Sequence, residues 1–372
     1  MTKFLKRWLR GRPVEMPIDR MTDGGAANAA DLPDGLCLDI GAMQRRAAEA
    51  APRLLAWTRA GIDDPLEWQA AVRLRLAEIS GYGLFGGPPG MLHCRDHDAA
   101  DRGGLHQRSI FIRVRDGRDI PVRLVWSAGS ASPEAWPVAL CLQGDGRDMA
   151  TSWVGAAGHD GADAAAEIDF ARQAARRGYL AVCVELPGAG LRQGRSNDAV
   201  AKLAVGGSML GDAASDVASV VNWLTQGDCG FPIDLDRIAV IGHGSGAAVA
   251  VLTAAMDARC SAVVAAGGIG PHRATVGRQE LPLPYVVPGL LQWMDMEDVV
   301  ALCAPRPVLI LSAEDDPLWP ASGGRHIVSH AGAVYERLGA TQAIAAKALA
   351  AGQCFDENQA WDWLAAVLAA PD

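Results

Sequence analysis

The sequence predicts an α/β fold, in which a mostly parallel sheet carries helices on both faces. Short apolar runs of strand length alternate along the chain with segments whose apolar residues recur at helical spacing. Half of the 372 residues are hydrophobic and 21% are charged, which allows a large core and excludes disorder. One pair of alternating segments around a turn predicts an antiparallel hairpin ahead of the parallel part.

The first 107 residues are expected to form a helical extension. Residues 1 to about 35 are rich in Gly, Ala and Asp and show no periodicity. Apolar residues recur at helical spacing from Ala42 to Ala60 and from Pro65 to Ile79. A glycine-rich run then ends the second helix, and it is not a phosphate loop because it does not open a helix after a strand. The expected buried positions are Leu54, Leu55, Trp57, Trp68, Val72, Leu74 and Leu76.

The α/β domain is expected to cover residues 108–372. Ser109–Val114 and Ile120–Trp126 alternate around Asp116-Gly117, which predicts the hairpin, placed at the edge of the sheet. Residues 269–295 are rich in Pro, Gly and Leu and are expected to overhang a pocket like a lid. The expected strands are 138–142, 180–184, 238–241, 262–266, 308–311 and 344–349, and the helices 163–177, 212–226, 245–256, 321–338 and 356–368.

Three loops follow strands of this sheet and are expected to meet at its carboxyl edge, where open α/β sheets place their sites. They are Gln143–Arg147, Gly242–Gly246 and Ser312–Pro320. A turn at 352–355 joins them before the last helix. The second loop stands between a strand and a helix, as a nucleophile turn does. The acidic third loop and the turn at 352–355 follow it, which gives the chain order nucleophile, acid, base.

The chain resembles the branch of the α/β-hydrolase superfamily that holds dienelactone-hydrolase-like and acetyl-xylan-esterase-like carboxylesterases. The resemblance spans roughly residues 65–370 and implies the fold but no particular substrate. The motifs that carry it include Leu142-Gln-Gly-Asp-Gly146, Leu186-Pro-Gly-Ala-Gly190, Asp236-Arg-Ile-Ala-Val-Ile-Gly-His243, Ala304-Pro-Arg-Pro307 and Glu314-Asp-Asp-Pro317.

The family's triad positions depart from the family pattern in two places. The family elbow is Gly-His-Ser-x-Gly, and this chain has Gly244 in the nucleophile slot. Glycine adopts the positive φ of that slot at little steric cost, but it has no oxygen with which to attack. Asp316, or less favourably Asp315, takes the acid position. Gln353 stands where the family has a histidine, and an amide is not a general base near neutral pH.

The loop that would stabilise an oxyanion keeps its glycine backbone. A carboxylate there would oppose a developing negative charge, although N–H groups at a helix N-terminus still favour an anion or a polarised carbonyl. We therefore expect a pseudoenzyme-like binding protein or a non-hydrolytic catalyst of the lyase, isomerase or cyclase type. The residues of this loop are Gln143, Gly144, Asp145 and Gly146.

The alternative is an active carboxylesterase that uses Ser245 as a shifted nucleophile. Ser245 lies between Gly244 and Gly246, which favours a tight turn. His243 would then stand two residues before the nucleophile, where an elbow needs a small side chain. The competing interpretation of Ser245 is a first helical residue that contributes its backbone N–H.

The other candidate residues have weaker signals. His243 is expected to be structural, beneath the elbow, and Ser208 to be a loop or cap residue. His326 and His330 share a helix face without a third ligand, so neither a metal nor another cofactor is predicted. His159 and His272 lie in loops near the predicted rim, within reach of a ligand.

The pocket is expected to bind a small apolar or aromatic molecule rather than a sugar. Its expected lining residues are Tyr285, Leu290, Trp293 and Trp319. A net charge of −9 excludes nucleic acid and acidic membranes as favourable partners. The basic N-terminus is followed by no apolar run of signal-peptide length, and the eight cysteines form no CxxC pair. We therefore expect a cytoplasmic protein with free thiols. The sequence leaves open whether the chain forms a homo-oligomer.

Overall fold

The computed structural model describes residues 40–83, 91–102, 104–127, 133–144, 169–194, 198–227, 229–276, 281–353 and 355–369. Contacts group Gln44–Asp372 into one unit and Met1–Met43 into another. All of the elements below belong to the first of these units, except that helix α2 begins in the second. The division of the chain at residue 107 stays a prediction.

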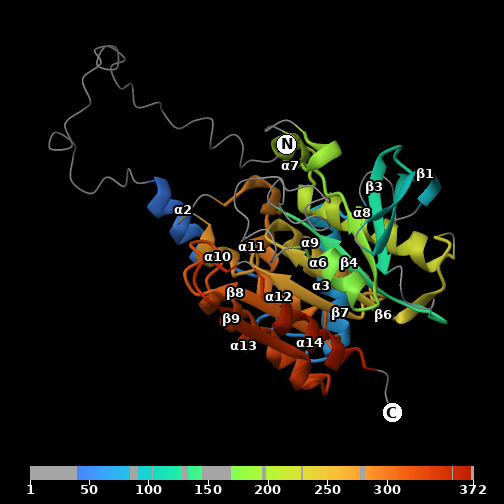
Figure 1. Cartoon of the computed structure of the whole chain (residues 1–372). Coiled ribbons are helices and arrows are strands. Elements are labelled where there is room, and N and C mark those ends of the chain that lie inside the picture. The colour runs from blue at the N-terminus through green and yellow to red at the C-terminus, as the bar shows by residue number, and fades with distance from the viewer. Residues whose placement is uncertain are drawn as a thin grey trace, which may run out of the picture. The chain divides into compact units, whose positions relative to one another are not determined.

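One sheet of nine strands organises the described residues, in the order β1-β2-β3-β5-β4-β6-β7-β8-β9. In this order, the pairs β1-β2, β2-β3 and β3-β5 are antiparallel, and every later pair, from β5-β4 to β8-β9, is parallel. Figure 1 shows β1 and β3 toward one end of the sheet and β8 and β9 toward the other. The strands are β1 (Met91–Arg102), β2 (Leu105–Val114), β3 (Asp119–Ser127), β4 (Trp136–Leu142), β5 (Leu180–Val184), β6 (Ile233–His243), β7 (Ala262–Ala266), β8 (Val308–Ala313) and β9 (Ile344–Leu349).

The strand order reverses at β4, which places the site. β4 pairs with β5 on one side, where Val138 is opposite Leu180, and with β6 on the other, where Val138 is opposite Ile238. The connections after β4 and β5 therefore lead to opposite sides of β4 in the sheet. Open α/β sheets bind ligands at such a reversal, outside the carboxyl ends of the strands.

Helices cover both faces of the sheet because its central strands are apolar on both sides. In β6, Ile238 and Val240 join one core cluster, and Ala239 and Ile241 join the other. Helices α3, α8, α9, α12 and α13 pack in the first cluster, and α6 and α14 in the second. The helices are α2 (Ile40–Glu49), α3 (Pro65–Ser80), α6 (Phe170–Arg176), α7 (Asp198–Ala204), α8 (Met209–Thr225), α9 (Ser245–Met256), α10 (His272–Thr275), α11 (Leu290–Trp293), α12 (Met296–Ala301), α13 (Ala321–Arg337) and α14 (Glu357–Val367), with the 3-10 turns η3 (Gly190–Arg192), η4 (Leu283–Tyr285) and η5 (Thr341–Ala343).

Helix α3 has clear local signals at both ends. The Asp64 carboxylate accepts hydrogen bonds from the Leu66 and Glu67 N–H groups, and Pro65 occupies the first helical position. Gly81 ends the helix with a φ of 71°. These signals explain why this helix starts and ends within a residue of the sequence prediction.

The edge of the sheet differs from the prediction. The predicted hairpin is present as β2 and β3, but β1 pairs along β2 and forms the edge instead. β1 lies within residues that the sequence assigned to a helical extension. Its sequence, Met-Leu-His-Cys-Arg-Asp-His-Asp-Ala-Ala-Asp-Arg, lacks a run of apolar or β-branched residues, and its pairing partner supplies the strand geometry.

The helix predicted from Ala42 to Ala60 is also shorter than expected. α2 ends at Glu49, and turns follow. Arg53 has a φ of 44°, which a continuous helix does not allow. Two of the expected buried residues, Leu54 and Leu74, are exposed. Leu74 is two positions from the buried Val72 and therefore faces away from the packed side of α3.

None of the helices in the described part of the chain is long and apolar enough to span a membrane.

The contact between α3 and α8 gives a test of the fold. A Cβ on Gly211 would lie 2.1 Å from the Ser80 carbonyl oxygen, whereas one on Gly332 in α13 would meet nothing within 4 Å. We expect Gly211→Ala to lower the free energy of unfolding by about 1–3 kcal/mol through overpacking. Gly332→Ala should raise it by about 0.4–1 kcal/mol, because alanine loses less entropy in a helix. Urea unfolding followed by tryptophan fluorescence measures the free energy of unfolding of both variants. Equal effects would contradict the close contact between Gly211 and Ser80.

Candidate functional site

The elbow between β6 and α9 is centred on Gly244. β6 ends at His243, α9 begins at Ser245, and Gly244 has φ 56° and ψ −127°. The Gly244 N–H donates to the Ala266 carbonyl at 2.9 Å, and its carbonyl accepts from the Ala247 N–H at 2.9 Å. The predicted register is therefore confirmed: Gly244 is the turn residue, in a backbone conformation that favours glycine. Ser245 is the first residue of the helix.

Three further glycines allow the elbow to pack tightly against its neighbours. A Cβ on Gly242 would lie 2.1 Å from the Gly246 carbonyl oxygen, and one on Gly246 would lie 2.2 Å from the Leu142 carbonyl oxygen. A Cβ on Gly268, which follows β7, would lie 1.9 Å from the Gly244 carbonyl oxygen. Backbone therefore packs against backbone at these three positions, and a side chain at Gly242, Gly246 or Gly268 would push the neighbouring backbone away.

The Ser245 hydroxyl lies against the loop that follows β4. A Cβ on Gly144 would lie 2.4 Å from Ser245 Oγ, 2.5 Å from Ser245 N and 2.4 Å from Gly246 N. Gln143 is buried and Ser245 is partly buried. The first-turn N–H groups of a 12-residue helix carry a partial positive charge, which favours negative charge on an oxygen near them. Asp145 and Gly146, predicted in the same loop, lie outside the described residues.

The acidic loop and the turn before α14 lie side by side, as the sequence predicted. The link is Asp315, whose Oδ1 accepts from the Gly352 N–H at 3.1 Å. Asp316 Oδ1 instead accepts from the Leu318 and Trp319 N–H groups, both at 2.8 Å, and so holds its own loop. Gln353 Oε1 accepts from the Ala350 N–H at 3.1 Å. Asp316 and Gln353 therefore stabilise their own turns, and Asp315 joins the two turns.

The aromatic residues predicted to line a pocket separate into two groups. Tyr285 and Trp319 are buried with ring centroids 5.3 Å apart, and Trp319 lies edge-on to His272 at 6.3 Å. This group packs His272 and Tyr285 onto the acidic loop. Trp293 lies elsewhere, with the Arg75 guanidinium carbon 3.9 Å from its ring centroid. Leu290, also predicted to line the pocket, is buried at the start of α11 and lines a cavity of about 520 Å³ together with His272.

A buried carboxylate, Asp295, anchors the same connection. Asp295 has no exposed surface, and its Oδ1 accepts from the His272 N–H at 2.7 Å and the Met296 N–H at 2.8 Å. Arg273 pairs with both Asp295 and Glu297. Burial lowers the pKa of His272, so its ring favours the neutral form.

The two helical histidines, His326 and His330, lie side by side on α13, with ring centroids 4.0 Å apart. His326 Nε2 lies 2.6 Å from Arg273 Nη2, and burial followed by the proximity of His330 lowers its pKa. His330 is exposed. The described residues contain no group of three side chains that could hold a metal ion.

The remaining candidates are structural or lie outside the described residues. Ser208 caps α8: its hydroxyl accepts from the Gly211 N–H at 2.9 Å and donates to the Ser80 carbonyl at 2.8 Å, which confirms the predicted cap. His243 ends β6 next to the elbow and is partly buried. His159 lies outside the described residues.

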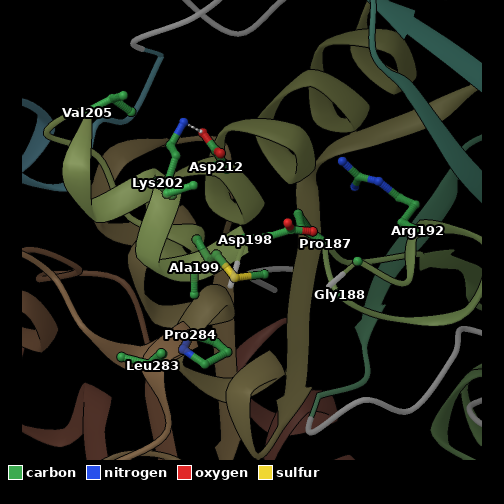
Figure 2. A pocket seen from close by; sticks show the side chains of 13 residues that line it. Pro187, Gly188, Arg192, Asp198, Ala199, Lys202, Val205, Asp212, Leu283 and Pro284 are labelled. Carbon is green, nitrogen blue, oxygen red and sulfur yellow. Dashed lines mark ion pairs between the residues drawn. The ribbon is translucent and has the colours of Figure 1, made fainter. Parts of the chain in front are cut away.

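A pocket of about 660 Å³ opens beside the loop that follows β5. In Figure 2, Lys202 points toward Asp212, and their atoms Nζ and Oδ1 are 2.6 Å apart. Arg192 Nη2 lies 2.7 Å from Asp216 Oδ2. The lining residues come from this loop, η3, α7, α8 and η4, and are Pro187, Gly188, Arg192, Gly194, Asp198, Ala199, Ala201, Lys202, Val205, Met209, Asp212, Leu283 and Pro284.

Sequence reasoning missed this pocket. The motif Leu186-Pro-Gly-Ala-Gly190 directly follows a buried strand and therefore marks a loop at the carboxyl edge, which was the available signal. The partners of its charged residues are harder to find. Asp212 is ten positions from Lys202, and Asp216 is 24 positions from Arg192, so their pairing depends on how α7 and α8 pack.

The glycine pair after β7 gives a test of the elbow. Gly267 and Gly268 have φ of 64° and 66°, so alanine at either position incurs a similar backbone cost of about 1–2 kcal/mol. Only the Cβ at 268 would collide with the Gly244 carbonyl oxygen, since a Cβ at 267 meets Gly244 N at 4.0 Å. We expect Gly268→Ala to lower the thermal unfolding midpoint clearly more than Gly267→Ala. Equal midpoints would contradict the close contact between this loop and the elbow.

Comparison with known proteins supports the fold. No family model matches the chain. The chain is 30% identical over 186 residues to a Bacillus subtilis (strain 168) protein named "Putative hydrolase YtaP", a match that covers 49% of this chain and 61% of that protein.

Solved structures match a larger share of the chain at lower identity. A putative acetyl xylan esterase from Bacteroides fragilis matches with a TM-score of 0.66 at 17% identity, over 86% of this chain and 84% of its own. A CE15 glucuronoyl esterase from Teredinibacter turnerae matches with a TM-score of 0.59 at 18% identity, over 91% and 93%. The chain therefore has the α/β-hydrolase fold and is similar to hydrolases and esterases built on it.

Proposed function

We propose that the chain hydrolyses a carboxylic ester, with the Ser245 hydroxyl as the attacking group. The observation that carries the proposal is the position of Ser245 Oγ, against the Gly144 backbone at the first turn of α9. The similarity to a protein named as a hydrolase and to esterases of the same fold supports ester hydrolysis over other chemistry. The substrate is a small molecule that binds at the carboxyl edge of the sheet.

In this proposal the backbone performs the electrostatic part of the reaction. The N-terminus of α9 stabilises negative charge on Ser245 Oγ and on the carbonyl oxygen that it attacks. Gly144 leaves this position open, because a side chain there would occupy the space next to Oγ. Gln353 does not remove the Ser245 proton, because an amide is not a base, so solvent hydroxide takes that proton. Oγ then bonds to the ester carbonyl carbon, the alkoxide leaves and takes a proton from water, and a second water hydrolyses the acyl group from Oγ. We therefore expect the rate to rise steadily with pH, without a histidine inflection near 6.5.

Labelling with a fluorophosphonate probe tests the nucleophile. The probe should attach to Ser245, as located by mass spectrometry of the labelled peptide, and Ser245→Ala should lose the label together with hydrolysis of p-nitrophenyl acetate. The matched control is Ser329→Ala, which removes an exposed hydroxyl from α13 and should change neither result. Absence of label in the wild-type chain, or label at another residue, would refute Ser245 as the nucleophile.

A second candidate is a non-hydrolytic catalyst of the lyase, isomerase or cyclase type, or a protein that only binds an apolar or aromatic ligand. It is favoured by Gly244, which supplies no oxygen at the centre of the elbow, and by Gln353, whose Oε1 already accepts from the Ala350 N–H. Ligand binding without fluorophosphonate labelling would support this candidate over the first.

A double substitution tests whether the family's positions still align. Gly244→Ser combined with Gln353→His places a hydroxyl and an imidazole at the family's nucleophile and base positions. A positioned general base accelerates by about 10²–10⁴-fold, so the double variant should hydrolyse p-nitrophenyl acetate at least about 100-fold faster than either single variant. Its rate should also gain an inflection near pH 6.5. A folded double variant, checked by circular dichroism, with no gain would show that residues 244 and 353 do not face a common substrate position.

A further inference from the structure

We propose that the pocket beside β5 binds the aliphatic chain of a neutral amphiphile, meaning an uncharged molecule with an apolar chain and a hydroxyl-bearing head. That this molecule is the ester attacked by Ser245 rests on the proposed function above. Binding of the amphiphile is a separate property of the pocket, which Figure 2 shows from close by.

The wall of the pocket is mostly apolar, as a hydrocarbon chain requires. Its volume of about 660 Å³ falls within the range of small-molecule sites. More than half of the lining residues have apolar side chains, and they come from the loop after β5, from α7 and α8, and from η4. They are Pro187, Ala199, Ala201, Val205, Met209, Leu283 and Pro284.

The surface around the pocket is unusually apolar as well. The described residues include ten exposed large apolar side chains, and four of them stand on the short segments that build this pocket. Val205 and Leu283 line the pocket and are 58% and 41% exposed. Leu191 and Val200, 74% and 49% exposed, stand on η3 and α7. Exposed apolar side chains gathered around a cavity mark a binding site for an apolar group.

The charged residues of the pocket favour a neutral head over an ion. Two cations, Arg192 and Lys202, and two carboxylates, Asp198 and Asp212, line the pocket. Lys202 is paired with Asp212 at 2.6 Å, and Arg192 with the buried Asp216 at 2.7 Å. An added anion or cation would have to compete with these pairs. A hydroxyl can instead donate to a carboxylate and accept from a cation without breaking either pair.

The pocket lies on the same edge of the sheet as the elbow. It follows the carboxyl end of β5, and β5, β4 and β6 are successive neighbours. Two strand spacings correspond to about 10 Å across the sheet. Helix α7 and η4 contact each other, and both line the pocket.

Binding of 1-O-alkylglycerol ethers tests the proposal, because an ether cannot be hydrolysed. The butyl, hexyl and octyl ethers are titrated into the full chain by isothermal calorimetry, below their micelle concentrations. Each added methylene should tighten binding about threefold to fourfold if the chain is buried. Nonanoate and octyltrimethylammonium, which carry the same eight-carbon chain with a charged head, should bind more weakly than the octyl ether.

Two variants assign the binding to this pocket. Val205→Asp and Leu283→Asp each place a charge on the lining and should weaken binding of the octyl ether at least about tenfold. The matched control is Leu235→Asp, because Leu235 is 56% exposed but stands in the amino-terminal part of β6, at the opposite end of that strand from the elbow. It should leave the affinity unchanged. All three positions are exposed, so the variants are expected to fold, which circular dichroism checks.

The outcomes separate this inference from the proposed hydrolysis. Affinity that rises with chain length and falls in both lining variants, without fluorophosphonate labelling of Ser245, would uphold the pocket and refute the esterase proposal. Labelling of Ser245 together with an affinity that does not depend on chain length would uphold the esterase proposal and refute binding of the chain in this pocket. Equal loss of affinity in Leu235→Asp, or tighter binding of either ion than of the ether, would also overturn the inference.

Discussion

The site depends on direct contact between backbone segments around the elbow. Gly144, Gly246 and Gly268 have no side chains, so the β4 loop, the first turn of α9 and the β7 loop approach each other closely around Gly244. That contact keeps the N-terminus of α9 directly above the reversal in strand order at β4. The electrostatic character of the site, positive N–H groups beside a hydroxyl, is therefore a consequence of packing that only glycine permits.

The parallel core was predictable because such strands are buried on both faces and read as uninterrupted apolar runs. The strands Ala262–Ala266 and Ile344–Leu349 and the helix Ser245–Met256 have the bounds that the sequence predicts. Prediction failed where structure comes from a distant partner. β1 owes its conformation to pairing with β2. The early end of α2 at Glu49 is different, because Pro52 is a local signal against a continuous helix that the prediction overlooked.

The candidate site shows the same division. The position of Gly244 at the turn between β6 and α9 followed from local motifs, whereas residues 145–147 of the predicted loop after β4 lie outside the described residues. The role of each acidic residue did not follow, because Asp315 and Asp316 are adjacent and differ only in which N–H groups lie within reach. The pocket beside β5 was also missed, since Arg192 and Lys202 pair with residues of α8 that periodicity alone cannot assign to them.

Asp295 has a consequence for the connection that was expected to act as a lid. Its carboxylate holds the His272 N–H and Arg273 at one end of the segment and the Met296 N–H at the other. One buried carboxylate therefore holds the described ends of this connection together. η4 stands between those ends in the chain and forms one side of the pocket, so any movement of that side takes place about a fixed base.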